Sequence, residues 1–159
     1  MAFKRERIHD IEQARVVIRK YCAYQERCHQ EVYRRLRDMG LGQEAIQTLI
    51  AELVTEDYLS ESRFVSVFVR SKWNQKGWGK RRLKLELQKR AIHDRLIQSG
   101  LAEIDDAAYA QALEKHIIKW LDGENLTSDR RQALWQHLLR KGYESPLIEA
   151  SLRSLNLTR

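Results

Sequence analysis

Residues 83–104 read LKLELQKRAIHDRLIQSGLAEI, and the same pattern of apolar positions occurs 51 residues earlier and 51 residues later. The earlier stretch, residues 32–53, is VYRRLRDMGLGQEAIQTLIAEL, and the later one, residues 134–155, is LWQHLLRKGYESPLIEASLRSL. Five apolar columns align without a gap: Val32/Leu83/Leu134, Leu36/Leu87/Leu138, Ile46/Ile97/Ile148, Ile50/Leu101/Leu152 and Leu53/Ile104/Leu155. Self-similarity at a fixed period indicates a repeat architecture. The sequence therefore predicts one helix–turn–helix unit written three times, with Gly40, Ala91 or Gly142 between its two halves.

Apolar residues at helical spacing also predict a helix before each of these pairs, the first from about Ile8 to Tyr24. Nothing in the chain reads as a strand. The predicted fold is all-α, with three tandem three-helix, helix-turn-helix-like repeats that form an elongated, curved array. Their expected bounds are residues 1–57, 58–104 and 105–159. Such arrays usually work by presenting an extended surface to a large partner.

Helix-start signals support this division. Ser60, Thr127 and Ser145 each precede a predicted helix and are expected to cap it, because a side-chain oxygen there accepts from an otherwise unpaired backbone N–H. Pro146 is expected at the first position of the last helix, where its missing N–H costs nothing.

The composition indicates a soluble, helix-rich protein, with 43% apolar and 32% charged residues and a single proline. No apolar run approaches the ~18 residues that a membrane span needs, and the N-terminal stretch MAFKRERIHDIEQ has no apolar segment of the kind found in secretory signals. We therefore expect a cytoplasmic, monomeric protein without a membrane partner. Cys22 and Cys28 are expected to be reduced thiols in or near a core, since these two and His29 are too few for a zinc site.

The net charge of +7 is concentrated in one segment. Residues 70–95 carry ten basic side chains and only two acidic ones, Glu86 and Asp94, whereas residues 1–69 are neutral overall and residues 96–159 have a net charge of −1. A segment this basic in an otherwise balanced chain indicates an anionic partner, which could be nucleic acid, an acidic protein surface, or both together. The alternative is a solvated helix face.

No arrangement of side chains predicts catalysis. Gly77-Trp78-Gly79 begins a GxGxxG pattern, but Arg82 replaces the last glycine and no strand precedes it, so the dinucleotide interpretation fails. The five histidines show no paired spacing, and the acidic pairs Glu56-Asp57 and Asp105-Asp106 lie at unit boundaries. We expect no catalytic residue, no metal, no cofactor and no enzymatic activity.

The four tryptophans are Trp73, Trp78, Trp120 and Trp135. They are expected mostly in the core, with Trp135 half buried. Trp78, between two glycines and beside the basic cluster, is the exception, since an exposed ring there could stack on a base or on a partner side chain.

Residues 58–92 resemble the central signature of the RecX family. The matching residues are Tyr58-Leu59-Ser60-Glu61-Ser62-Arg63-Phe64-Val65, Phe68-Val69, Lys76-Gly77-Trp78-Gly79-Lys80-Arg81-Arg82-Leu83, Glu86-Leu87 and Ile92. Ser60 and Glu61 replace the two aspartates of the signature, Asp57 replaces the glycine before Tyr58, and Ala91 replaces the glycine before Ile92. Any role that needs both aspartates is therefore in doubt for this chain.

The resemblance implies a negative regulator of RecA recombinase. Members of this family bind in the groove of the RecA filament on single-stranded DNA and limit filament extension, ATP hydrolysis, strand exchange and co-protease activity. The residues expected to contact the filament or its DNA are Arg63, Lys72, Lys76, Trp78, Lys80, Arg81, Arg82 and Lys84.

Two alternatives stay open at this point. Arg63 and Arg82 could instead be structural and pair with Glu61 and Glu86, while Lys80, Arg81 and Lys84 are expected to share the helix face opposite Leu83 and Leu87. The chain could also be a helix-turn-helix-type DNA-binding protein that acts directly on nucleic acid through its basic helix.

Overall fold

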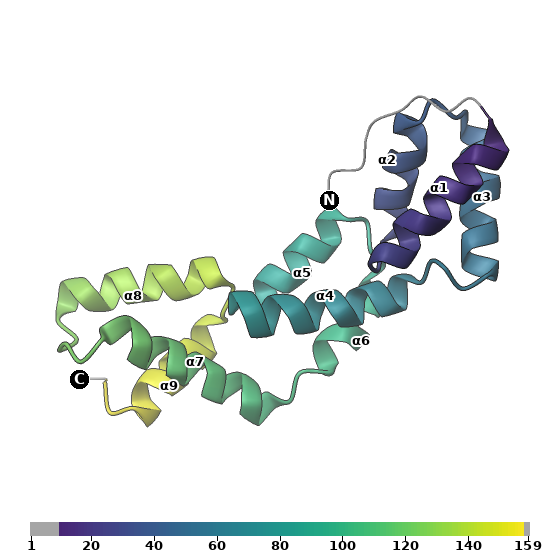
Figure 1. The fold of residues 1–159 in the computed structure, drawn as a ribbon. Helices are drawn as coiled ribbons and strands as arrows, with labels where there is room; N and C mark the ends of the chain where they lie inside the picture. Colours follow the sequence, from purple (N-terminus) through teal and green to yellow (C-terminus); the bar gives the residue numbers. More distant parts are fainter. Residues whose placement is uncertain (1–9, 158–159) are drawn as a thin grey trace. The chain divides into compact units, whose positions relative to one another are not determined.

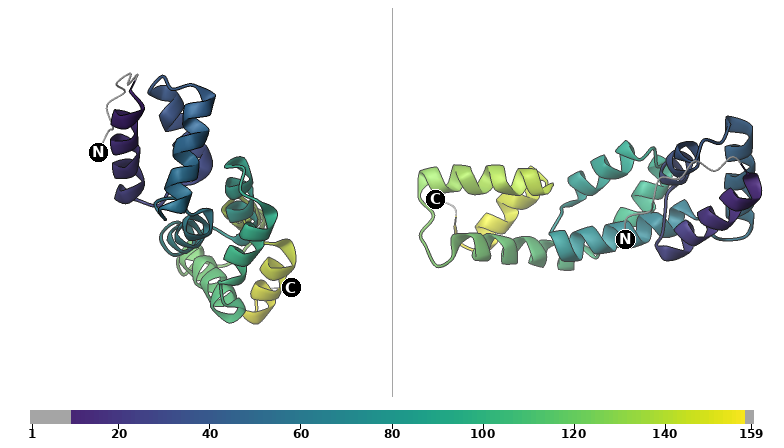
Figure 2. Two further views of the ribbon diagram at one scale, coloured as in Figure 1. Left: turned by 90° about the vertical axis from the view of Figure 1, so that its right-hand side faces the viewer. Right: turned by 45° about the horizontal axis from the view of Figure 1, so that its top comes forward.

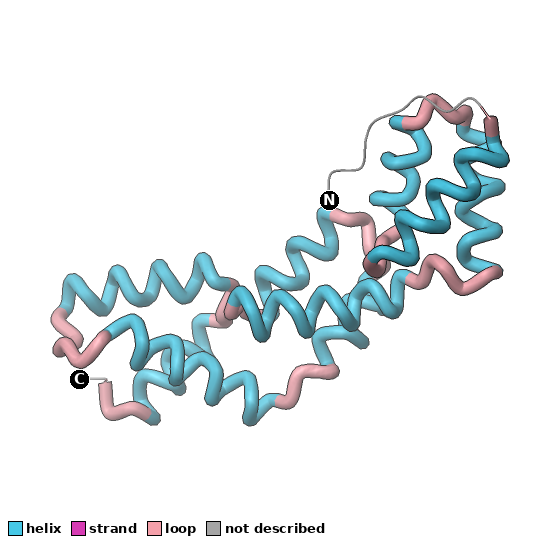
Figure 3. The backbone as a smooth tube through the Cα atoms, in the orientation of Figure 1, coloured by secondary structure: helices cyan, strands magenta, loops and turns pink. Residues whose placement is uncertain are grey.

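The computed structural model describes residues 10–157, and these residues form helices and loops without a strand (Figure 3). The nine helices are α1 (Ile11–Tyr24), α2 (His29–Asp38), α3 (Gln43–Thr55), α4 (Glu61–Lys76), α5 (Lys80–Lys89), α6 (Asp94–Ala102), α7 (Asp106–Leu121), α8 (Ser128–Lys141) and α9 (Ser145–Ser154) (Figure 1). The predicted all-α class is confirmed. Residues 1–9, which include Ile8, the expected start of the first helix, and most of the stretch in which no secretory signal was expected, lie outside the described residues. No described helix is both long enough and apolar enough to cross a bilayer.

The chain divides into two compact units, and the division falls inside α4. The first unit holds residues up to Val67 together with Arg90–Ile92, and the second holds Phe68–Lys89 and the residues from His93 onward. The predicted division into three repeats stays a prediction.

The first unit is built from α1, α2 and α3, which pack side by side around one apolar core (Figure 1). Two parallel ion pairs join α1 to α3: Arg15 Nε lies 2.8 Å from Glu52 Oε2, and Arg19 Nη2 lies 2.7 Å from Glu56 Oε2. The pairs repeat at a four-residue spacing, on α1 and at the end of α3, where Glu56 is the residue just past the helix. Residues i and i+4 of a helix lie on one face. They therefore fix which faces of α1 and α3 meet.

In the second unit α7 packs on α9, α8 also contacts α9, and α5 packs on α6 (Figure 2). The largest fully buried side chain is Tyr143, and other fully buried members of this unit include Leu83, Leu87, Ile97 and Leu113. The unit has no acidic or basic side chain in its buried core among the described residues. The stabilisation is therefore chiefly that of buried apolar surface.

The five aligned columns of the sequence are the core positions of these helices. Twelve of the fifteen residues are buried, and Ile50, Leu101 and Leu155 are half buried. The residue between the halves adopts a positive φ each time: 91° at Gly40, 55° at Ala91 and 99° at Gly142. A left-handed residue just past a helix end reverses the chain and lets the last carbonyls be bonded. At Gly142 this is visible directly, since Tyr143 N–H donates to Leu138 O at 3.1 Å.

Most helix starts agree with the sequence, and one does not. Arg63 N–H donates to Ser60 Oγ at 3.2 Å, and Arg130 N–H donates to Thr127 Oγ1 at 3.3 Å, which confirms both caps. Ser145, expected as a cap, is instead the first residue of α9, and Glu144 occupies the cap position without a side-chain cap bond. Pro146, expected at the first position, is therefore the second residue of α9. The Glu144 carboxylate accepts a hydrogen bond from the Tyr109 hydroxyl at 2.9 Å instead of capping the helix.

The tryptophans depart from the expectation of a mostly core location. All four are half buried, including Trp135 as predicted and Trp78, for which an exposed ring was one possibility. The two cysteines are buried free thiols, as expected. Burial raises the pKa of each thiol to about 11, so both stay protonated near neutral pH and are poor nucleophiles and metal ligands.

Candidate functional site

The basic helix α5 begins where α8 ends, and the two helix ends are joined by backbone hydrogen bonds. Gly79 N–H donates to Lys141 O at 2.7 Å and Arg81 N–H donates to Gly142 O at 3.0 Å. Lys80 N–H donates to the Tyr109 hydroxyl at 2.8 Å. The first N–H groups of a helix have no partner inside it. Here the carbonyls at the end of α8 and one tyrosine supply those partners.

The glycines around Trp78 make this junction possible. A Cβ at Gly79 would lie 2.4 Å from the carbonyl carbon of Gly142, which is closer than any side chain can approach. Gly77 has φ +65°, and a Cβ there would lie 2.5 Å from His116 Cε1. Lys141 Nζ completes the turn by donating to Lys76 O, the last carbonyl of α4, at 2.9 Å. The Lys-Gly-x-Gly segment is thus the place where the backbone between α4 and α5 comes into direct contact with the end of α8.

Three of the residues expected to contact a partner are engaged within the chain. Lys80 Nζ lies 3.3 Å from Asp106 Oδ1 and 4.8 Å from the centroid of the Tyr109 ring. The expectation that Lys80 shares the exposed face of Arg81 and Lys84 is therefore wrong, because the first turn of α5 packs against the start of α7.

Arg82 is also a structural residue, though not through Glu86. Its guanidinium lies 4.2 Å from the centroid of the Trp78 ring and donates to Arg140 O at 3.4 Å. Glu86 pairs instead with Lys89, at 3.3 Å. Trp78 is further packed by the edge of the Phe68 ring, at 6.1 Å, and by Lys72 Nζ, at 5.3 Å. The ring is therefore covered by neighbours and is poorly placed to stack on a partner.

Arg63 holds together loops of the first unit. Its Nε lies 3.0 Å from Glu26 Oε1 and its Nη1 lies 2.7 Å from Asp57 Oδ1, while Nη2 donates to Asp57 O at 2.9 Å. The hydrogen bonds to Asp57 and then to Glu26 raise the pKa of Arg63. The structural alternative for Arg63 is thus supported, but its partner is not Glu61, because Glu61 Oε2 accepts from the backbone N–H of His29, at 3.3 Å, where α2 begins.

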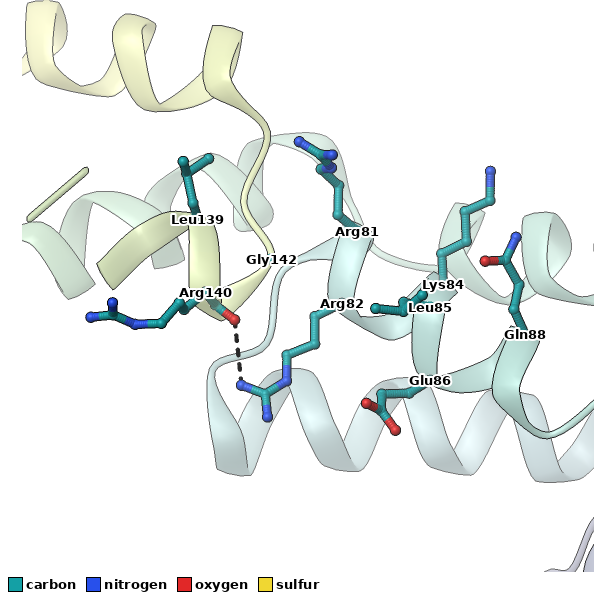
Figure 4. Close-up of a pocket in the computed structure, with 9 residues that line it drawn as sticks. All are labelled: Arg81, Arg82, Lys84, Leu85, Glu86, Gln88, Leu139, Arg140 and Gly142. Carbon is teal, nitrogen blue, oxygen red and sulfur yellow. Dashed lines mark hydrogen bonds between the residues drawn. The ribbon is translucent and has the colours of Figure 1, made fainter. Parts of the chain in front are cut away.

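Of the other expected cations, Lys72 is half buried beside the Phe68 and Trp78 rings, whereas Lys76, Arg81 and Lys84 are exposed. Arg81 and Lys84 line a groove with a residue that sequence reasoning missed. Arg81 and Lys84 are exposed on α5, and Arg140 is exposed at the end of α8. They line a cavity of about 610 Å³ whose other side chains include Leu85 and Leu139. Arg81 and Lys84 extend to one side of α5, whereas Arg82 and Glu86 extend to the other (Figure 4). Lys76 is exposed at the end of α4, outside this groove.

The groove combines three exposed positive charges with apolar side chains, and Leu85 is 52% exposed. Glu86 is the only carboxylate among the lining residues, and it is already paired with Lys89. Three exposed cations beside apolar side chains favour an anionic partner. In the part of the chain that the structure describes, no cluster of His, Cys, Asp or Glu could hold a metal ion.

The chain is similar in sequence to proteins of one known family. The model of the second three-helix domain of RecX matches residues 60–101, which hold α4, α5 and most of α6. A curated relative from Halorhodospira halophila, named Regulatory protein RecX, is 32% identical over 133 residues, which are 81% of this chain and 80% of that protein. The chain belongs to the RecX family. The resemblance seen in the sequence is thereby confirmed.

Other RecX relatives differ in length. A Regulatory protein RecX of Bacillus licheniformis is 31% identical over 84% of this chain but only 51% of its own length, so this chain spans about half of that relative. One from Prosthecochloris aestuarii is 28% identical and is covered to 88%. The crystal structure of RecX from Lactobacillus salivarius has the same fold, with a TM-score of 0.83 over 93% of this chain and 97% of that one, at 23% identity.

The RecX signature therefore consists mainly of residues that build the fold. Ser60 caps α4, Glu61 bonds the start of α2, Arg63 joins two loops and Gly79 permits the junction of α5 with α8. Ser60 and Glu61, which stand at the two aspartate positions, also carry side-chain oxygens. Ser60 can therefore still cap a helix, and Glu61 keeps one negative charge. Arg140 could have been found from its place one residue before Lys141-Gly142, the helix end that repeats at the fixed period.

Proposed function

We propose that this RecX protein is a negative regulator of RecA recombinase that binds in the groove of the RecA filament on single-stranded DNA. In this proposal it limits filament extension, ATP hydrolysis, strand exchange and co-protease activity, and it acts as a cytoplasmic monomer. Membership of a family whose curated members are named regulatory proteins supports the proposal.

The observation that carries the proposal is the groove beside α5. Arg81, Lys84 and Arg140 place three exposed cations around Leu85 and Leu139. A filament of protein on DNA presents both phosphate charge and protein surface, and a groove that is cationic and partly apolar is suited to such a mixed partner. In this proposal the protein acts by occupying a binding site and not by chemistry of its own.

A second candidate function is direct DNA binding of the helix-turn-helix type, which the charge of α5 favours. In that mode the N-terminal residues of the recognition helix approach the bases or phosphates. Here the N–H groups of Gly79, Lys80 and Arg81 are bonded to Lys141 O, the Tyr109 hydroxyl and Gly142 O. Because these N–H groups are already bonded within the chain, they are not available to a DNA phosphate. We therefore rank direct DNA binding by α5 second.

The test is inhibition of RecA's DNA-stimulated ATPase by the Arg81→Glu, Lys84→Glu double variant. Both side chains are exposed, so the variant should keep wild-type helicity and melting behaviour. The matched control is Arg34→Glu, Arg37→Glu, which makes the same charge change on the exposed side of α2. We expect the α5 variant to need roughly tenfold more protein for half inhibition, equivalent to about 1.4 kcal/mol of binding, and the control to inhibit like wild type.

Three outcomes would contradict parts of the proposal. Wild-type protein that leaves the ATPase unchanged would refute the function, and undiminished inhibition by the α5 variant would remove the groove from it. The direct DNA-binding alternative gains if single-stranded DNA is bound tightly without RecA, if the α5 variant abolishes that binding, and if log affinity falls with log salt by about 0.7 per phosphate contact.

A further inference from the structure

A second recess lies in the same unit, away from the groove, between the last turns of α4 and one side of α7. Its volume is about 400 Å³, and none of its lining residues lines the groove beside α5. The lining residues are Trp73, Asn74, Ala108, Gln111, Ala112, Lys115, His116 and Lys119. Ligand pockets typically have volumes of ~300–1,000 Å³, so this recess is large enough for one small ligand.

Two aromatic side chains, Trp73 and His116, line the recess. Trp73 is half buried, and its indole Nε1 is buried without a hydrogen-bond partner among the described residues. A buried indole N–H normally has a partner, and its lack is costly. His116 is held in place by the ring of Tyr143, 6.0 Å between centroids, and by the close approach of Gly77. Ala108 and Ala112 also line the recess, and their side chains occupy little of its volume because each is a single methyl group.

The outer part of the recess is cationic. Lys115 and Lys119 lie one turn apart on the same face of α7, and both are exposed. Asn74 and Gln111, also exposed, supply amide groups that can both donate and accept hydrogen bonds. No carboxylate lies among the lining residues, so nothing in the recess neutralises the two ammonium groups. Burial, and then Lys141, lowers the pKa of His116, which leaves its imidazole neutral at physiological pH.

We propose that this recess binds a nucleotide, with the planar base against Trp73 and the phosphate at Lys115 and Lys119. Aromatic side chains stack on any base because every base has a π-face, and lysines beside them follow the phosphates. An aliphatic acid would satisfy the lysines but not the aromatic wall, and a metal ion would be repelled by both lysines. The site is independent of the RecA proposal, because it uses neither the groove nor α5.

The experiment measures binding of a fluorescein-labelled 15-nucleotide oligo-dT by anisotropy, at low salt and without RecA. Two variants address the recess in different ways. Lys115→Gln, Lys119→Gln removes the charges, and Ala112→Leu fills the recess while every charge stays. The matched control Arg34→Gln, Arg37→Gln removes two exposed charges from α2. We expect each recess variant to weaken binding about tenfold, or about 1.4 kcal/mol, and the control to change it by less than about threefold.

Unlabelled deoxythymidine monophosphate then distinguishes the source of the nucleotide. Competition at millimolar concentration indicates a site for a free nucleotide, and competition only by unlabelled oligo-dT indicates one unit of a strand. The proposal is overturned if the wild type binds neither probe, if Ala112→Leu binds as tightly as wild type, or if the control loses as much as the lysine variant. If strand binding is lost only on changing Arg81 and Lys84, the binding belongs to α5 and the recess is refuted. Should Ala112→Leu fail to fold by circular dichroism, the exposed lysine pair decides the question alone.

Discussion

Two stacked tyrosines in the second unit differ in one respect, the partner of the hydroxyl. The rings of Tyr109 and Tyr143 lie 5.2 Å apart between centroids, and the side chains are 4% and 0% exposed. The Tyr109 hydroxyl accepts from Lys80 N–H and donates to Glu144. The Tyr143 hydroxyl is buried and has no partner among the described residues. Replacing each by phenylalanine keeps both rings and removes one oxygen.

The two substitutions should have opposite effects on stability. Tyr109→Phe leaves Lys80 N–H without an acceptor at the start of α5, and an unsatisfied buried group costs about 1–3 kcal/mol. Glu144 is half buried. Its carboxylate can bond to water once the Tyr109 hydroxyl is removed, so the free energy lost at Glu144 is smaller than that lost at Lys80 N–H. We expect a total loss of about 2 kcal/mol. Tyr143→Phe removes a polar group that is buried at a cost of about 1–3 kcal/mol when unpaired, so we expect no loss, or a gain of up to about 1 kcal/mol.

Urea unfolding followed by far-UV circular dichroism measures this difference, provided that the slope with denaturant is unchanged. In thermal unfolding, about 2 kcal/mol corresponds to roughly 4–8 °C in Tm for a chain of this size. Burial raises the pKa of the Tyr109 hydroxyl, so the bond to Glu144 persists across neutral pH. Equal midpoint shifts for the two variants, or a larger loss for Tyr143→Phe, would refute the assignment of the α5 start to Tyr109.

Two further predictions concern stability. Ala91 has φ 55°, a left-handed conformation that costs a non-glycine residue about 1–2 kcal/mol, so Ala91→Gly should raise the free energy of unfolding by about 0.5–1 kcal/mol after the entropy of glycine in the unfolded chain is subtracted. The control Ala133→Gly, on the exposed side of α8, should lower the free energy of unfolding by about 0.5–1 kcal/mol. Stabilisation at both positions, or at neither, would disprove the strain at Ala91. Burial, and then Lys141, lowers the pKa of both His116 and His137. The unfolded chain therefore binds more protons than the folded protein below about pH 6.5, and stability should fall as the pH is lowered from 7.5 to 5.5. The urea midpoint of the His116→Gln, His137→Gln variant should change less over this range, and an unchanged dependence of the midpoint on pH would exclude these two histidines as the cause of the fall.

The candidate site was only partly predictable from sequence. Charge counting located the basic segment, and helical geometry placed Arg81 and Lys84 on an exposed face. It could not show that Lys80 pairs with Asp106, which is 26 residues away, or that Arg82 lies on Trp78 and bonds to Arg140 O. Those partners come from α7 and α8, and no local pattern encodes which helices meet. Arg140 and the recess beside Trp73 were missed for the same reason.

The sequence by itself determined the all-α class, the core columns and most helix ends, because these follow from the spacing of apolar residues and from capping side chains close in the chain. The left-handed residues at Gly40 and Gly142 were visible as glycines for the same local reason. Only the tertiary structure decided which cations remain exposed and which stabilise the fold. That choice depends on the meeting of α5 with α7 and α8, where carbonyls, a carboxylate and aromatic rings far away in the sequence satisfy Lys80 and Arg82 but leave Arg81 and Lys84 in solvent.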